Sequence, residues 1–280
     1  MIEKAYAKIN LALDVTACRE DGYHELEMVN LPLNFFDTLT IEEAEKTSYH
    51  CNRSYIYFDE KNTVVKALNL LKERFCIDKE FTVILQKHIP TRAGLGGGSA
   101  DAAAVFRALR KMYSLQASEE EWISLATRVG ADVPYCLFNR PAIVRGIGEK
   151  LDFFELKNTY TFLLVKPRRG VSTKEAFDRL DMALCDHTDV AALAQALREG
   201  DDRKAFPLMK NSLERSSFEI EPAVRKIKTR LLKEGYDPVM MSGSGATVFA
   251  ICENNEKTQK TMEQFRKHGN FVRICTNLTI

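Results

Sequence analysis

The sequence predicts an α+β protein with two domains, and three observations support that prediction. A glycine-rich segment, 94–98, lies between a predicted strand and a predicted helix. Strands and helices alternate through the second half of the chain, which also contains a glycine turn at 243–245. The 280 residues suffice for one large domain or two ordinary ones, and the composition changes near 153–159. We therefore predict an N-terminal domain over 1–155 and a C-terminal domain over 156–280.

Composition and charge narrow the class of protein. Hydrophobic residues make up 45% and charged residues 28% of the chain, which is typical of a folded globular protein. The net charge of +1 gives no reason to expect nucleic acid or a membrane surface as partner. No signal-peptide pattern opens the sequence, and no apolar run approaches the ~18 residues that span a membrane. Seven scattered cysteines without a Cys-x-x-Cys pair favour reduced thiols and disfavour zinc. We expect a cytoplasmic protein, and its oligomeric state stays open.

The glycine-rich segment predicts an anion site. Residues 81–85 are β-branched and aromatic, which predicts a strand, and 100–112 contain strong helix formers without a breaker. Glycines between them allow the backbone N–H groups to approach a ligand closely, and a helix start adds positive charge. The spacing matches neither common phosphate loop, because no lysine follows the glycines and Ser99 stands sixth from Gly94. Phosphate is the expected ligand, and a flexible linker is the alternative.

The N-terminal segment contains two polar pairs. Apolar residues alternate through 7–15, which predicts a strand with one buried face. Lys8 and Asn10 share the opposite face, and the pattern alone favours a solvated polar surface there. An Asp-Gly turn follows, and Tyr23 and His24 come directly after it. Without further information the pair is typical of a packed loop.

The rest of the first half continues as strands and helices. Further strands are predicted at 29–41 and 54–58, and a helix at about 59–74. Ser118, followed by three glutamates, predicts another helix start. Asp132 lies between Ala and Val and next to a proline, which predicts a buried carboxylate, and a helix cap is the alternative.

The second half predicts an α/β sandwich. The expected strands are 160–166, 237–241, 246–252 and 270–275, and the expected helices are 172–183, 189–198, 202–209, 221–234 and 255–267. On its own, the Ser-Gly-Ser-Gly run at 242–245 predicts a hairpin turn. By pattern alone, Phe177 is as well explained as a core aromatic as by any other role.

The segment Pro-x-x-x-Gly-Leu-Gly-Gly-Gly-Ser-x-Asp-Ala-Ala resembles the ATP loop of the galactokinase, homoserine kinase, mevalonate kinase and phosphomevalonate kinase (GHMP) superfamily. Within it, the chain is most similar to the 4-diphosphocytidyl-2-C-methyl-D-erythritol kinases, along nearly its whole length. The resemblance implies a GHMP-kinase architecture, with an N-terminal domain like ribosomal protein S5 and a ferredoxin-like C-terminal α/β sandwich. It also implies ATP as cofactor, bound by Pro90, Gly94, Leu95, Gly96, Gly97, Gly98, Ser99 and Ala100. At position 100, relatives commonly carry serine.

The resemblance also implies a catalytic pair. Lys8, in Ala-Lys-x-Asn-Leu, falls on the active-site lysine of the family, and Asp132, in Gly-Ala-Asp-Val-Pro, on its catalytic aspartate. The implied reaction transfers the γ-phosphoryl group of ATP to a 2-hydroxyl group, with Asp132 as general base. Lys8 would orient Asp132, keep it ionised and offset charge on the transferring group. Mg²⁺ is expected with ATP, although no acidic cluster in the sequence names its ligands.

The substrate implied by the resemblance is a small cytidine-diphosphate-linked polyol. Tyr23 would stack on the cytosine ring, His24 would hydrogen-bond the base, and Phe177 would cover its other face. The remaining substrate contacts would come from Asn10, Gly243, Ser244 and Gly245. Residues 31–36 are less polar than expected for a strand near this substrate. Two alternatives stay open, namely a superfamily kinase that acts on another alcohol and a non-catalytic nucleotide-binding relative.

Overall fold

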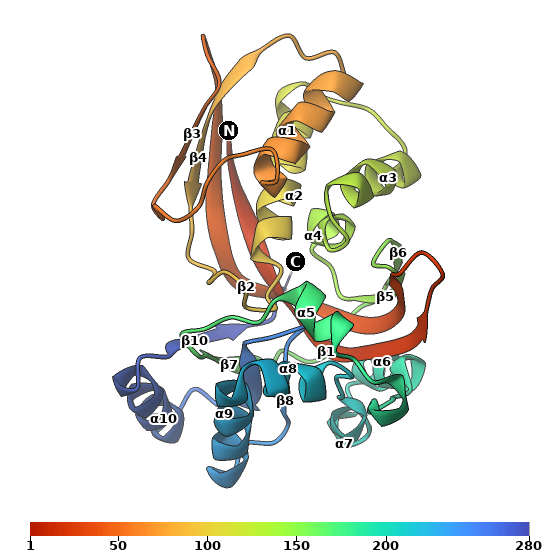
Figure 1. The fold of residues 1–280 in the computed structure, drawn as a ribbon, viewed down its shortest axis with the longest axis vertical. Coiled ribbons are helices and arrows are strands. Elements are labelled where there is room, and N and C mark those ends of the chain that lie inside the picture. The colour runs from red at the N-terminus through yellow and green to blue at the C-terminus, as the bar shows by residue number, and fades with distance from the viewer. Residues whose placement is uncertain (280) are drawn as a thin grey trace. The chain divides into compact units, whose positions relative to one another are not determined.

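A computed structural model describes residues 1–279, and their contacts divide the chain into two units (Figure 1). Unit 1 comprises Met1–Ala7, Phe35–Ile89 and Gly96–Asn139. Unit 2 comprises Lys8–Asn34, Pro90–Leu95 and the chain from Arg140 onward. Neither unit is a continuous stretch of sequence, and the glycine-rich segment passes from unit 2 into unit 1. The predicted domain boundary between 155 and 156 stays a prediction.

Two long strands, β1 (Ile2–Cys18) and β2 (His24–Ala44), contribute residues to both units. Every residue from 7 to 15 of β1 is buried. The prediction of a single buried face is therefore wrong, because β1 is covered on both faces in this stretch. Lys8 and Asn10 are 4% and 0% exposed, so the solvated polar surface that the pattern favoured is wrong as well.

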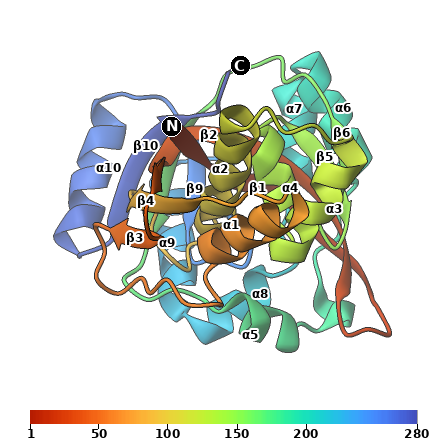
Figure 2. The same ribbon diagram turned by 90° about the horizontal axis from the view of Figure 1, so that it is seen from above.

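Unit 1 combines strands with four helices. The second half of β2 pairs antiparallel with β4 (Glu80–Gln86), and β3 (Ser48–Cys51) joins β4 in parallel. The helices are α1 (Thr63–Arg74), α2 (Gly97–Met112), α3 (Glu119–Val129) and α4 (Val133–Phe138). Figures 1 and 2 show α1 and α2 side by side on one face of β2 and β4. The predicted strand 81–85, and the helices at 59–74, 100–112 and after Ser118, are confirmed.

One predicted strand of unit 1 is wrong. Residues 54–58 form a loop between β3 and α1, in which Tyr55 and Tyr57 are 58% and 76% exposed. Alternating aromatic residues favour a strand locally, but no neighbouring strand pairs with them within the described residues. The strand that does form, β3, was not predicted, because its Ser-Tyr-His-Cys sequence lacks an apolar alternation.

Unit 2 contains a four-stranded antiparallel sheet in the order β10-β7-β9-β8. Its strands are β7 (Thr161–Lys166), β8 (Val239–Met241), β9 (Val248–Cys252) and β10 (Phe271–Thr276). Helix α9 (Pro222–Lys233) packs against β8 and β9, and α10 (Glu256–Lys267) against β10 (Figure 1). Separately, the first half of β2 pairs with β5 (Ala142–Gly146), and β5 with β6 (Lys150–Phe153).

The predicted helices of unit 2 are confirmed with two corrections and one addition. The helix predicted at 172–183 ends early, since α5 is Thr173–Asp178 and a 3₁₀ turn, Met182–Leu184, follows. The helix predicted at 202–209 stops at Ala205 (α7, Asp202–Ala205), because Pro207 in the next 3₁₀ turn, Phe206–Leu208, has no N–H to continue it. The remaining helices are α6 (Val190–Glu199) and α8 (Glu214–Ile220), of which α8 was not predicted.

The α+β class is confirmed, with the four-stranded sheet wholly in unit 2. In the part of the chain from 1 to 279, no helix is both long and apolar enough to cross a membrane.

Candidate active site

Among the described residues, no side chain caps the N-terminal end of α2. Its N-cap is Gly96, with φ +67° in the left-handed region, and it has no side chain to cap the first turn. The first helical hydrogen bond is donated by the Ala100 N–H to the Gly96 carbonyl, at 2.8 Å. The N–H groups of residues 97–99 precede that bond, and such groups have no acceptor inside a helix. These donors and the helix dipole suit an anionic phosphate group. Ala100 is buried, and its methyl group adds nothing polar to the loop.

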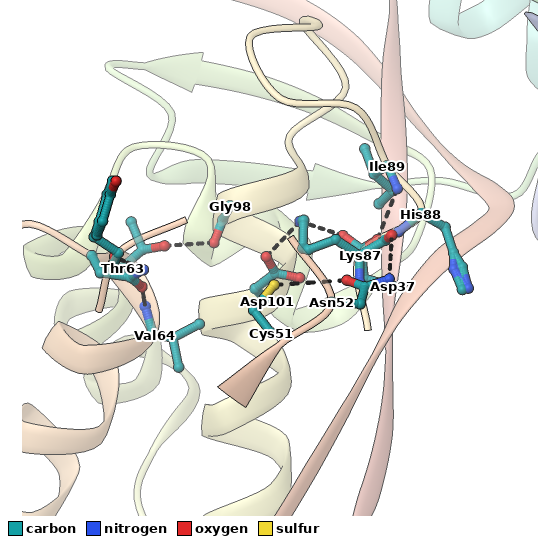
Figure 3. A network of polar contacts seen from close by, with 12 residues as sticks. Asp37, Cys51, Asn52, Thr63, Val64, Lys87, His88, Ile89, Gly98 and Asp101 are labelled. Atoms are coloured by element: carbon teal, nitrogen blue, oxygen red, sulfur yellow. Dashed lines mark hydrogen bonds and ion pairs between the residues drawn. The ribbon is translucent and has the colours of Figure 1, made fainter. Parts of the chain in front are cut away.

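The unit 1 half of the loop is held from two sides. The Thr63 hydroxyl, at the start of α1, donates a 2.8 Å hydrogen bond to the Gly98 carbonyl (Figure 3). On the other side, a Cβ added to Gly97 would lie 3.0 Å from Cγ2 of Ile89. A side chain at 97 would therefore displace the segment that enters the loop.

The unit 2 half of the loop is bound by β1 and by the second glycine turn. The Lys8 N–H donates to the Leu95 carbonyl at 3.0 Å, and the Ser242 hydroxyl donates to the Gly94 carbonyl at 2.8 Å. Gly94 has φ +71°, and a Cβ on it would collide with the Ser242 carbonyl oxygen. Pro90, which opens this half, is half-buried.

Lys8 and Asn10 form a buried polar chain in unit 2. The Lys8 Nζ donates to Asn10 Oδ1 at 3.0 Å, and Asn10 Nδ2 donates to Asn30 Oδ1 at 2.7 Å. The Asn10 N–H also contacts the Ser242 hydroxyl, at 3.4 Å. The arrangement satisfies polar groups that β1 could not otherwise bury, and it fixes the direction of the Lys8 side chain.

The second glycine turn joins β8 to β9, which confirms the hairpin predicted at 242–245. The Asn211 side chain holds the turn in place, because its Nδ2 donates to the Met241 and Gly243 carbonyls, each at 2.8 Å. The Ser244 hydroxyl lies 2.9 Å from that of Thr173, and the Ser244 side chain is 7% exposed. Gly245 completes the turn with φ +86°.

Aromatic residues gather elsewhere in unit 2. The rings of His24 and Phe177 are in contact, with centroids 4.9 Å apart and planes inclined by 32°. Tyr23, which precedes His24 in the sequence, is 59% exposed, and its N–H donates to Asp21 at 3.0 Å. Phe177 is half-buried, so it is not a fully enclosed core residue. A flat ring could pack against these exposed faces.

Asp132 is the one predicted catalytic residue that belongs to unit 1. It occupies the N-cap position of α4 but makes no side-chain capping hydrogen bond. The carboxylate is half-buried, so the prediction of a buried group is wrong. The cap alternative is confirmed only in position, because the side chain does not cap the helix.

The sequence did not single out several residues that hold these parts in place. Asn30 and Ser242 each contact Asn10, and Thr63 contacts the loop. Asn30 interrupts an apolar strand segment, Met-Val-Asn-Leu, and that interruption was the available signal. Ser242 lies in the Ser-Gly-Ser-Gly run that predicts the turn, but nothing near Ser242 or Thr63 in the sequence indicates their contacts, because their partners lie far away along the chain.

Comparisons with known proteins identify the family. A model of the GHMP kinases N terminal domain matches residues 62–140, and a model of the GHMP kinases C terminal domain matches 184–270. The 4-diphosphocytidyl-2-C-methyl-D-erythritol kinase of Thermoanaerobacter pseudethanolicus is 42% identical over 271 residues, which cover 96% of this chain and 93% of that protein.

The chain belongs to the GHMP kinases.

Within the GHMP kinases, the chain falls in the branch of the 4-diphosphocytidyl-2-C-methyl-D-erythritol kinases. The enzyme of that name from Clostridium kluyveri is 41% identical, covering 92% of this chain and 93% of the relative. A crystal structure of 4-(cytidine 5'-diphospho)-2C-methyl-D-erythritol kinase matches with a TM-score of 0.82 and 31% identity over 100% of both chains. A homoserine kinase from Cytophaga hutchinsonii, at 20% identity and a TM-score of 0.73, shares the fold.

The GHMP models cover the two glycine segments and Asp132. Gly96–Ser99 and Asp132 lie in the matched N terminal domain, and Gly243–Gly245 in the matched C terminal domain. Lys8, Tyr23 and Phe177 lie outside both models. The two-domain GHMP-kinase architecture predicted from the glycine loop is thus confirmed, and the kinase is an ATP-dependent enzyme that acts on a small molecule.

Proposed function

We propose that this GHMP kinase transfers the γ-phosphoryl group of ATP to the 2-hydroxyl group of 4-diphosphocytidyl-2-C-methyl-D-erythritol. This reaction is a step of the non-mevalonate isoprenoid pathway. The observation that supports it most is the N-terminal end of α2, which no side chain in the described part of the protein caps. The chain that carries it is related over 96% of its length to a kinase of that name. Localisation in the cytoplasm stays a prediction.

In the proposed reaction the substrate hydroxyl oxygen attacks the γ-phosphorus atom. The bond between that phosphorus and the β–γ bridging oxygen breaks, ADP leaves, and the hydroxyl proton passes to the Asp132 carboxylate. Phosphoryl transfer has a loose transition state, so placement and charge neutralisation supply most of the rate enhancement. The N–H groups of residues 97–99 bind the β- and γ-phosphates, and Lys8 supplies a positive charge to the transferring group.

The substrate end is proposed to bind in unit 2. His24 and Phe177 present contacting rings, and the exposed ring of Tyr23 is free to stack on cytosine. The turn at Gly243–Gly245 offers the backbone N–H groups of Gly243 and Ser244 to the substrate diphosphate, since the Gly245 N–H already donates to the Ser242 carbonyl. Asn10 carries the buried contact between Lys8 and the turn.

Mg²⁺ is proposed to accompany ATP. Within residues 1–279, no group of three or more His, Cys, Asp or Glu side chains is placed to hold a metal ion. The proposed ion would arrive with the nucleotide, since Mg²⁺ in kinase sites takes many of its ligands from phosphate and water. When bound, it would neutralise charge on the β- and γ-phosphates.

The test is substrate-dependent ADP release by the purified kinase. We expect release with Mg²⁺-ATP and 4-diphosphocytidyl-2-C-methyl-D-erythritol, and none above background with homoserine or mevalonate. Asp132→Asn should lower kcat by roughly 10²- to 10⁴-fold, because general-base catalysis contributes about that much. Asp78→Asn, at an exposed carboxylate in the loop between α1 and β4, is the matched control.

Two results would contradict the proposal. Phosphorylation of homoserine or mevalonate, without turnover of the cytidine substrate, would assign the kinase to another alcohol. Unchanged turnover by Asp132→Asn would remove the proposed base.

A further inference from the structure

Directly after β4, Lys87 places its ammonium group between two buried carboxylates (Figure 3). Its Nζ lies 2.6 Å from Oδ2 of Asp101 in α2, and it also pairs with Oδ2 of Asp37 in β2. The three residues are 4%, 3% and 0% exposed for Lys87, Asp101 and Asp37, and all belong to unit 1. We call these three residues the Lys87 cluster. It joins the strand that enters the glycine loop to the helix that leaves it.

The first connection of the cluster is to the strand exit. Asp37 Oδ1 accepts the N–H groups of His88 and Ile89, the latter at 2.8 Å (Figure 3). Ile89 is the last residue of unit 1 before the loop begins at Pro90. Asp37 therefore fixes the direction in which the chain leaves β4, and its other oxygen is held by Lys87.

The second connection is to the start of α2. Asp101 lies five residues after the N-cap Gly96, so its ion pair holds the second turn of the helix. A Cβ on Gly97 would lie 3.4 Å from Lys87 Nζ. The ammonium group is thus packed directly against the first residue of the helix, where the proposed phosphate donors begin.

The cluster is not arranged for maximal stability. Asp101 Oδ1 is buried and has no hydrogen-bond partner among residues 1–279, and two carboxylates share one ammonium group. Burial raises the pKa of Asp101 to about 7, and Asp37 adds to the rise while Lys87 opposes it. Replacing buried ion pairs with apolar side chains is often neutral or stabilising. What such a cluster supplies, and an apolar core would not, is a directional link between three backbone segments.

We propose that Lys87 is a positioning residue for the phosphate loop. By binding Asp37 and Asp101 together, it sets the strand exit and the N-terminal two turns of α2 in the geometry that binds the ATP phosphates. This inference rests on the proposed binding of ATP at that loop. It assigns no chemical step to Lys87, whose ammonium group acts through the backbone.

The test separates the link from the charge. Asp101→Leu leaves Lys87 paired with Asp37 but disconnects α2, whereas Asp101→Asn retains an oxygen that can accept from Lys87. We measure the Kd for Mg²⁺-ATP by calorimetry, the two KM values and kcat. Asp101→Leu should raise the Kd for ATP about tenfold or more, since the loss of one charge-assisted hydrogen bond to a phosphate group weakens binding by about that factor. The KM for the cytidine substrate should stay within about twofold, and Asp101→Asn should restore ATP binding to within about threefold.

Lys111→Met is the matched control. Lys111 lies on the same helix, ten residues after Asp101, and pairs with the buried carboxylate of Glu3 at 2.6 Å. Lys111→Met should lower the melting temperature without changing the Kd for ATP. Equal effects of Asp101→Leu and Lys111→Met on the Kd, or a stability loss in Asp101→Leu with unchanged Kd, would overturn the proposal. If the leucine variant does not fold, Asp101→Ser, too short to reach the ammonium group, provides the same comparison.

Binding and turnover distinguish this inference from the proposed function. ATP binding that responds to Asp101→Leu, without turnover of the cytidine substrate, supports the positioning role and refutes the substrate. Turnover of the cytidine substrate by the wild type, with an unchanged Kd for ATP in Asp101→Leu, supports the substrate and refutes the positioning role. No ATP binding by the wild type would overturn both.

Discussion

Gly94 and Ser242 lie in direct contact, with the Ser242 hydroxyl donating a 2.8 Å hydrogen bond to the Gly94 carbonyl. Gly94 adopts φ +71°, and a Cβ there would collide with the Ser242 carbonyl oxygen. The first glycine loop and the second glycine turn are thereby packed backbone to backbone within unit 2. Gly94 cannot accept a side chain at this point without moving the turn.

Gly94→Ala should therefore lose ATP binding. The left-handed conformation alone costs an alanine about 1 kcal/mol, and the collision with Ser242 adds to it. We expect a rise of more than about tenfold in the Kd for Mg²⁺-ATP, measured by calorimetry. Gly235→Ala is the control, because Gly235 has φ +78° but meets only the end of the flexible Lys257 side chain, at 3.5 Å. Equal ATP binding by both variants would show that the contact with Ser242 is unimportant.

Asn211→Ala should weaken binding of the cytidine substrate more than that of ATP. The substitution leaves the Met241 and Gly243 carbonyls without their donor, and buried unpaired groups cost about 1–3 kcal/mol each. We expect the KM for the cytidine substrate to rise about tenfold in steady-state assays. Asn277→Ala removes a comparable buried bond, in which Oδ1 accepts the Tyr160 N–H at 2.7 Å, and should reduce only stability. A rise in KM of the same size in both variants would point to general loosening of the unit.

Phe177→Leu tests the aromatic part of the site. Base stacking on an aromatic ring contributes about 1–3 kcal/mol, so the KM for the cytidine substrate should rise about tenfold while the KM for ATP stays constant. Phe206→Leu, at another half-buried aromatic of unit 2, should change neither value. The prediction fails if Phe177→Leu leaves both KM values unchanged, and Phe177 would then be a packing residue against His24.

The stability of the kinase should depend on pH through Asp101. Burial, with Asp37 adding to it and Lys87 opposing it, raises the pKa of Asp101 from 3.8 to about 7. The folded state then binds this proton more tightly than the unfolded chain, so stability falls as pH rises from 3.8 to about 7 and is level above that. Asp101→Asn removes this contribution.

Urea unfolding at pH 5 and pH 8 measures the effect. The free energy of unfolding of Asp101→Asn, relative to wild type, should be higher at pH 8 than at pH 5 by on the order of 1 kcal/mol. The exposed control Asp78→Asn should show the same pH dependence as the wild type. A parallel pH dependence in Asp101→Asn and wild type would mean that Asp101 is ionised throughout this range.

Local patterns were sufficient for most elements, because strand, helix and turn signals act over a few residues. The order of β4, glycine loop and α2 followed from β-branched residues, glycines and an alanine-rich run. The pattern failed where tertiary contacts decide. Lys8 and Asn10 alternate with apolar residues as surface groups would, yet they are buried by contacts with Asn30 and Ser242.

The Lys87 cluster illustrates the same limit. Asp37 and Lys87 are 50 residues apart in the sequence, and no local pattern near either residue predicts their contact. A lone carboxylate in an alanine-rich helix, Asp101, was the only local anomaly. The resemblance to a family supplied Lys8 and Asp132 as candidates, but it could not supply the residues that hold the loop.

The contact between Gly94 and Ser242 also has a consequence for the order of events on the ribosome. The two residues are 148 positions apart, so the glycine loop emerges long before its partner has been translated. A nascent chain that ends before Ser242 contains all of unit 1 but lacks the turn that holds Gly94. Synthesis proceeds from the N-terminus at about 5–20 residues per second, so Ser242 is translated about 7–30 seconds after Gly94. We therefore expect the loop to reach its full affinity for nucleotide only after Ser242 has been translated, and chains truncated before Ser242 to bind ATP more weakly.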